Sequence, residues 1–181
     1  MIPTIRETLL FISKILNDSQ IPHVLIGGVA LGYHAEPRAT QDVDLTLAVD
    51  EKSWSAFRKA LEKEKIIWIL SQVPAGETTP DFARFSWRGR KVDLQISKTA
   101  YQDEVVRRSL KKKEEGQTIF VATPEDLFVL KLIANRGQDL TDLENLLRHN
   151  PELDFVYIRK WCRHWEIEGH LDAFLASLKI R

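Results

Sequence analysis

The chain has 181 residues, 44% of them hydrophobic, and it carries 26 basic and 26 acidic side chains. This composition predicts one globular domain, or one domain with a small helical appendage, and the zero net charge excludes an overall electrostatic attraction to nucleic acid without excluding a local basic patch. The single cysteine, Cys162, excludes an internal disulfide and favours a reducing compartment.

In the first part of the chain, helix patterns alternate with strand patterns. Apolar residues at helical spacing predict a helix over residues 4–17. The apolar run His23–Ile26 predicts a first strand, which turns through two glycines into a short helix, Gly28–Ala35. After a loop, the pattern predicts a second strand, Asp42–Val49, and a helix over Glu51–Lys65.

The middle of the chain reads as strands followed by a basic helix. The continuous apolar run Ile66–Leu70 predicts a buried strand. Phe82–Trp87 and Lys91–Ile96 then predict a hairpin around a short turn. Residues Ala100–Lys113 predict a helix with a basic end, which is most simply a solvated helix terminus, the alternative being a contact for an RNA acceptor.

The last part of the chain is predicted to be mainly helical. A short strand, Gln117–Val121, is followed by Thr123, a residue suited to cap a helix, and by further helices over 141–149 and 155–179. The order of elements predicts an α/β fold with a mixed sheet flanked by helices. We expect residues 1–122 to form the core and residues 123–181 a helical region packed on it.

Three aspartates provide the chemistry that the pattern predicts. Asp42 and Asp44 are two positions apart in a strand and should project from one face, where two adjacent carboxylates repel unless a cation lies between them. Magnesium is the simplest such cation, with manganese as a substitute, and Asp93 on a second strand would complete a site for two ions. The alternatives are solvent-exposed edge residues for the first two, and for Asp93 an ion pair with Arg84 or Arg90.

The glycine pair Gly27-Gly28 forms a strand-to-helix corner. Without side chains, this corner lets the backbone approach a ligand and directs amides toward phosphate, so carboxylates and glycines together suggest a nucleoside triphosphate. The alternative is a tight corner that serves helix packing alone. Arg38 and Thr40 precede the carboxylates, and we expect both near the nucleotide, unless Arg38 pairs with Glu36 and Thr40 only starts the strand.

Residues 26–45 resemble the signature of the nucleotidyltransferase superfamily, in which a hydrophobic residue and Gly-Gly or Gly-Ser are followed by Asp-x-Asp and by a later strand aspartate. The Arg-x-Thr-x-Asp-x-Asp version is closest to bacterial AbiEii-like nucleotidyltransferases, which include toxins of type IV toxin–antitoxin and abortive-infection systems. Residues 123–143 also resemble that group, in which a helix carrying a lysine, here Lys131, leads into an Arg…Asp…Asp-Leu segment.

The resemblance implies a polymerase-beta-like nucleotidyltransferase fold. It also implies magnesium-dependent transfer of a nucleoside monophosphate from an NTP to a hydroxyl acceptor, with release of pyrophosphate. In such families the lysine corresponding to Lys131 reaches toward the nucleotide phosphates, whereas by itself a lysine in an apolar helix more often snorkels to solvent. Arg136, Asp139 and Asp142 are predicted to be mainly structural, through capping and ion pairing, with a possible role at the edge of the site.

The partners are less defined by the sequence. The acceptor could be RNA such as tRNA, a protein hydroxyl or a small molecule, and a cognate antitoxin or another protein partner would fit the family. The alternative to an enzyme is a non-catalytic binding or regulatory protein with the same fold. Charges near the N-terminus argue against secretion, and no apolar run approaches the ~20 residues of a membrane span, so we expect a cytoplasmic protein with no membrane partner.

Overall fold

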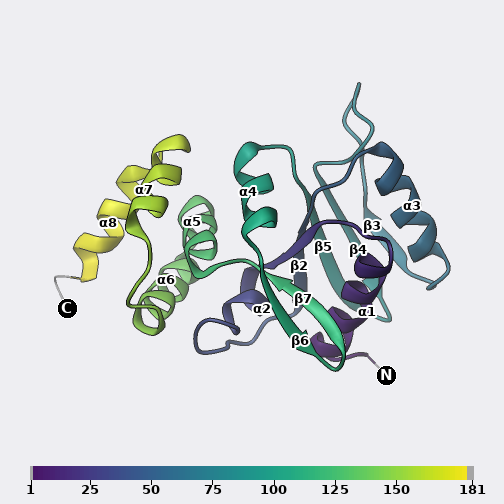
Figure 1. Ribbon diagram of the computed structural model, residues 1–181, viewed down its shortest axis with the longest axis horizontal. Coiled ribbons are helices and arrows are strands. Elements are labelled where there is room, and N and C mark those ends of the chain that lie inside the picture. The colour runs from purple at the N-terminus through teal and green to yellow at the C-terminus, as the bar shows by residue number, and fades with distance from the viewer. Residues whose placement is uncertain (1, 179–181) are drawn as a thin grey trace.

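The computed structural model describes residues 2–178 as a seven-stranded mixed sheet flanked by helices (Figure 1). The strands are β1 (His23–Ile26), β2 (Asp42–Leu47), β3 (Ile67–Leu70), β4 (Phe82–Trp87), β5 (Arg90–Ile96), β6 (Leu110–Glu114) and β7 (Gln117–Val121). They follow the order β3-β4-β5-β2-β1-β7-β6 across the sheet. The pairs β2–β5 and β1–β7 are parallel and the others antiparallel, so the predicted mixed α/β sheet is confirmed.

Eight helices accompany the sheet within the described residues. They are α1 (Ile5–Asp18), α2 (Gly27–Leu31), α3 (Glu51–Glu62), α4 (Ala100–Arg108), α5 (Pro124–Ala134), α6 (Gly137–His149), α7 (Phe155–His164) and α8 (Glu168–Leu178). Helices α1 and α3 lie beside the sheet near the N-terminus, whereas α5 to α8 gather on the opposite side of the molecule (Figure 1). The predicted C-terminal helices are therefore present up to residue 178, and the last residue of that prediction, 179, lies outside the described part.

Side-chain caps fix the start of the helices that frame the site. Thr123 accepts a hydrogen bond from the Asp126 amide at 3.2 Å and so begins α5, with Pro124 in the first turn. Helix α6 begins at Gly137, four residues before the predicted Thr141, because the Asp139 carboxylate accepts the Arg136 amide hydrogen at 3.0 Å. The predicted capping role of Asp139 is thus present, whereas the predicted start of the helix is too late.

The prediction of one long helix over residues 100–113 is wrong at its end. Helix α4 stops at Arg108, and Leu110–Glu114 form the strand β6, which pairs antiparallel with β7. Glu115 and Gly116 join the two strands with φ values of +46° and +80°, a two-residue turn whose backbone favours a hairpin. The predicted basic helix end is thus divided, with two arginines on α4 and three lysines on an edge strand.

The strand β3 forms as predicted, but it is not buried. It lies at the edge of the sheet and pairs only with β4, which leaves Ile67, Ile69 and Leu70 exposed by 69%, 52% and 41%. A continuous apolar run is compatible with a central strand and with an edge strand, and in this protein it forms an edge strand.

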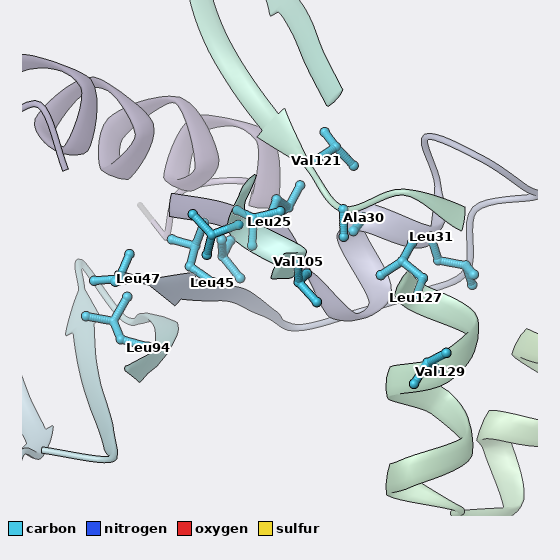
Figure 2. Close-up of a cluster of buried hydrophobic side chains, with 14 of the residues drawn as sticks. Leu25, Ala30, Leu31, Leu45, Leu47, Leu94, Val105, Val121, Leu127 and Val129 are labelled. Carbon is cyan, nitrogen blue, oxygen red and sulfur yellow. The ribbon is translucent and has the colours of Figure 1, made fainter. Parts of the chain in front are cut away.

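The core is built from alternate residues of the central strands. In β2, Val43, Leu45 and Leu47 are fully buried, and Figure 2 shows the side chains of Leu45 and Leu47 together with Leu25 of β1 and Leu94 of β5. Because successive strand residues point to opposite faces, Asp42 and Asp44 project away from this packed layer.

Candidate active site

The register of the sheet aligns the key carboxylates in one row. Ile26 of β1 lies opposite Asp44 of β2, Asp44 opposite Asp93 of β5, and Asp93 opposite Arg84 of β4. A cavity of about 450 Å³ lies over this row. All eight predicted site residues line it: Gly27, Gly28, Arg38, Thr40, Asp42, Asp44, Asp93 and Lys131.

Asp44 is the most perturbed of the three carboxylates. Burial raises its pKa to about 6, and the negative charges of Asp93 and Asp42 act in the same direction. Lys131 and Arg136 lower the pKa but do not offset the burial. Without ligands, Asp44 therefore keeps its proton up to about pH 6 and is ionised at an energetic cost above it, a cost that a bound cation would offset.

Because Gly27 and Gly28 have no side chains, the corner leaves room for the carboxylate of Asp44 and for the loop before β2. Gly27 has a φ of +71°, and a Cβ atom there would overlap Asp44 Oδ2, so only glycine lets the carboxylate lie against this backbone. A Cβ atom on Gly28 would lie 3.1 Å from Thr40 Oγ1 and 3.4 Å from Arg38 Nη2. Helix α2 has only five residues and ends at Leu31 instead of the predicted Ala35, so this corner acts through close approach more than through a helix dipole.

An ionic network centred on the buried side chains of Lys131, Asp139 and Asp142 faces the carboxylates across the cavity. Arg38 donates hydrogen bonds from Nε and Nη2 to Asp142 at 2.8 and 3.1 Å. Lys131 Nζ lies 2.6 Å from Asp142 and 2.8 Å from Asp139. Arg136 Nε donates to Asp139 at 2.9 Å. The two carboxylates thus hold three cations, from the loop before β2, from α5 and from the start of α6.

This network corrects two of the simpler alternatives. Arg38 pairs with Asp142 and not with Glu36, and Lys131 is only 4% exposed, so it does not snorkel to solvent. Burial favours a neutral Asp139, but hydrogen bonds from Arg136 and Lys131 lower its pKa to about 2 and keep it ionised. Asp139 and Asp142 lie behind the cavity wall as positioning groups for the cations that line it.

Arg84 belongs to the cavity, although the sequence suggested it only as one of two alternative partners of Asp93. Its Nε and Nη2 atoms donate to Asp93 Oδ1 and Oδ2, both at 2.5 Å. The sequence contained the signal for this contact, because counting back equally from the Arg88-Gly89 turn places Arg84 opposite Asp93. Arg90, the other suggested partner, instead bonds to the Pro3 and Gln41 carbonyl oxygens.

The donor set fits a divalent cation at two of the three carboxylates. Within residues 2–178, the side chains of Asp42 and Asp44 form no hydrogen bond or ion pair, and carboxylate oxygens are the ligands that magnesium and manganese prefer. No group of three His, Cys, Asp or Glu side chains is already gathered for a metal among these residues. The third predicted metal ligand, Asp93, already has a cationic partner, because Arg84 donates hydrogen bonds to both of its oxygens.

In the described part of the chain, no helix has the length and apolar character that crossing a membrane requires.

Comparison with known proteins adds a family and a fold. The family model described as nucleotidyl transferase AbiEii toxin, type IV toxin–antitoxin system, matches residues 9–171. A search of curated proteins gave no match.

Three solved structures illustrate the likeness of fold. An antigenic nucleotidyltransferase-like protein from Paracoccidioides brasiliensis has 18% identity and a TM-score of 0.57, over 96% of this chain and 86% of that chain. A Thermotoga maritima protein provisionally described as a nucleotidyltransferase has 17% identity and a TM-score of 0.57, over 82% and 96%. The antibiotic-resistance factor ANT(2'')-Ia has 11% identity and a TM-score of 0.55, over 96% and 95%. The predicted nucleotidyltransferase fold is confirmed.

Proposed function

Since the chain belongs to the AbiEii nucleotidyltransferase toxin family of type IV toxin–antitoxin systems, we propose that it transfers a nucleoside monophosphate from an NTP to a hydroxyl acceptor and releases pyrophosphate. The observation that carries this proposal is the pair of carboxylates Asp42 and Asp44, which have no hydrogen-bond or ion-pair partner in the part of the chain that the structure describes. They lie beside the glycine corner of a cavity whose opposite wall is cationic.

The distribution of charge supports a metal-chelated triphosphate as the ligand. Asp42 and Asp44 supply negative charge on the sheet side, whereas Arg38, Lys131 and Arg136 supply positive charge on the side of α5 and α6. Phosphate oxygens placed between the two sides would contact a cation held by the aspartates and the basic side chains at once. A neutral ligand would leave Asp42 and Asp44 without a cation and the cationic side with the one positive charge that Asp139 and Asp142 do not neutralise.

In the proposed mechanism, the protein mainly positions groups and supplies charge. Asp42 and Asp44 would hold the divalent cation, magnesium or manganese, which would supply neutralisation of phosphate charge. Gly27 and Gly28 let backbone amides approach the β- and γ-phosphates, and Thr40 lies at the same corner. Arg38 and Lys131 balance the charge that develops on pyrophosphate as the acceptor oxygen attacks the α-phosphate in line.

Asp93 is the proposed proton acceptor. Once it no longer shares both oxygens with Arg84, its carboxylate can take the proton from the acceptor hydroxyl. Its place beside Asp44 in the row puts this base next to the carboxylates that hold the metal.

The acceptor and the partners remain proposals. ANT(2'')-Ia, which shares the fold, is known in complex with adenylyl-2''-tobramycin, so a small-molecule hydroxyl lies within the chemistry of this fold. RNA such as tRNA, or a protein hydroxyl, would meet the same requirement of a nucleophilic oxygen. We also propose that residues 1–122 form the catalytic core, that residues 123–181 form a helical region closing one wall of the site, and that a cognate antitoxin counteracts the protein.

The test is a transfer assay with each α-labelled NTP in turn, magnesium, and either total tRNA or cell extract. We expect label on an RNA, protein or small-molecule product with the wild type, and none with Asp42→Asn. Asp18→Asn is the matched control, since Asp18 is an exposed aspartate that pairs with Lys14 outside the cavity. Equal labelling by wild type and Asp42→Asn would refute the metal assignment. Absence of both labelling and magnesium-dependent NTP binding would favour a non-catalytic binding protein.

A further inference from the structure

The ion pair between Arg84 and Asp93 is not needed to hold β4 and β5 together. Its guanidinium binds both carboxylate oxygens, and the two side chains are 34% and 13% exposed at the cavity wall. The strands β4 and β5 are already paired through six residue pairs, so the hairpin does not depend on this contact. The contact instead gives Asp93, one of the three carboxylates in the row, a positively charged hydrogen-bond partner.

The guanidinium of Arg84 occupies the place beside Asp93 at which a second divalent cation would bind. Asp93 lies beside Asp44 on one side and Arg84 on the other, so without Arg84 the empty cavity would hold three adjacent carboxylates with no cation directly on them. Like charges at this spacing oppose one another's ionisation. A guanidinium and a divalent cation can each relieve that repulsion, but their own charges repel, so Arg84 weakens the binding of a divalent cation at Asp93.

We propose that Arg84 is the resident counter-ion of Asp93 and takes the place of a second divalent cation in the protein without substrates. The free protein then binds one divalent cation, through Asp42 and Asp44. The third carboxylate becomes available only when Arg84 exchanges Asp93 for an anion that arrives with the substrates. Arg84 is thus a positioning residue for Asp93, and this inference rests on the metal site of the proposed function.

The test is titration of the substrate-free protein with Mn²⁺, followed by electron paramagnetic resonance to count bound ions and obtain their affinities. We expect one ion per chain in the wild type. In Arg84→Gln, we expect a second ion that binds about tenfold or more tightly than any second ion in the wild type, because the repelling guanidinium is gone. Arg84→Lys, which keeps the charge, should bind ions as the wild type does.

Lys91→Gln is the matched control. Lys91 is an exposed residue of β5 whose Cα lies opposite that of Asp42, so the variant removes one positive charge near the row without touching Asp93. It should leave the number of bound ions unchanged. If Lys91→Gln gains the same second ion as Arg84→Gln, or if Arg84→Gln gains none, the inference is overturned.

A second variant makes the test independent of whether Arg84→Gln folds. If Arg84 masks Asp93, then Asp93→Asn in the otherwise unchanged protein should keep one Mn²⁺ ion with nearly wild-type affinity. Loss of Mn²⁺ binding in Asp93→Asn would mean that Asp93 is a ligand in the free protein and would overturn the inference. Failure of the proposed function looks different, since Mn²⁺ binding would then survive in the double variant Asp42→Asn and Asp44→Asn.

Discussion

Replacing Asp44 by asparagine should stabilise the metal-free protein at neutral pH. Burial, with help from Asp93 and Asp42, raises the pKa of Asp44 from 3.8 to about 6. Each pKa unit corresponds to about 1.4 kcal/mol, so ionised Asp44 costs the folded protein up to about 3 kcal/mol above pH 6. Water reaches part of the carboxylate, so we expect a gain of about 2–3 kcal/mol in the free energy of unfolding for Asp44→Asn, which is roughly 4–12 °C in Tm for a chain of this length.

The pH dependence of stability follows from the direction in which the pKa of Asp44 is shifted. Because the folded protein holds the proton of Asp44 more tightly than the unfolded chain does, the wild type loses stability as the pH rises from about 4 through about 6. Asp44→Asn lacks this loss. Urea unfolding of both proteins in EDTA should therefore give similar free energies near pH 4 and a clear advantage for the variant at pH 8.

Magnesium provides the second part of the assay. A cation bound to ionised Asp44 should raise the Tm of the wild type at pH 8 and leave that of Asp44→Asn nearly unchanged. Asp18→Asn, at an exposed aspartate far from the cavity, should show neither effect. A destabilised Asp44→Asn variant at pH 8 in EDTA, or a stabilisation that does not vary with pH, would refute the argument from burial and repulsion.

Three further substitutions test separate contacts. Gly27→Ala should lower the free energy of unfolding by about 1–3 kcal/mol and weaken magnesium-dependent NTP binding, because its Cβ would overlap the carboxylate of Asp44; denaturant titration and a fluorescent NTP analogue measure the two effects. Gly76→Ala, with a φ of +82° and open space around it, controls for backbone strain alone. Lys131→Met should lower the free energy of unfolding in urea by about 1.5–3 kcal/mol, because Asp139 and Asp142 lose the cation that they share while each keeps one arginine. A change near zero would contradict the network. Ile67→Lys should reduce self-association in light scattering without changing nucleotide transfer, whereas unchanged self-association would mean that the apolar edge of β3 does not drive it.

Features that depend on local spacing could be predicted from the sequence. The alternation in Asp42–Leu47 separates core residues from carboxylates without reference to the rest of the fold. The hairpin of β4 and β5 could also be predicted, but the predicted turn of residues 88–90 is one residue too long. In the structure Arg90 pairs with Trp87, and the resulting two-residue turn fixes the partner of each position. The strand positions of the three aspartates follow from these two patterns, and the glycine corner follows from the apolar run and Gly-Gly of residues 23–28. The alignment of Asp44 with Asp93 depends in addition on the parallel pairing of β2 with β5, which joins distant segments.

Features that depend on contacts between distant segments could not be predicted in the same way. Arg38 and Asp142 are 104 positions apart, and nothing near Arg38 distinguishes that partner from the adjacent Glu36. The edge position of β3 depends on which strand lies beyond it, and apolar composition does not contain that information. The strand β6 forms because residues 110–114 find β7 across a turn with positive φ, although the same residues could continue a basic helix.

The long-range network explains how the site can attract a polyanion before it binds one. Asp139 and Asp142 neutralise two of the three charges on Arg38, Lys131 and Arg136, so the cationic wall keeps about one net positive charge while each of its side chains is held by hydrogen bonds. Bringing these cations together without the buried carboxylates would cost repulsion, and full neutralisation would remove the attraction. The opposite wall has the complementary excess in Asp42 and Asp44. A triphosphate with its metal ion neutralises the net positive charge of one wall and the net negative charge of the other. Neither the ion nor the triphosphate can do both alone, so NTP and metal should bind cooperatively.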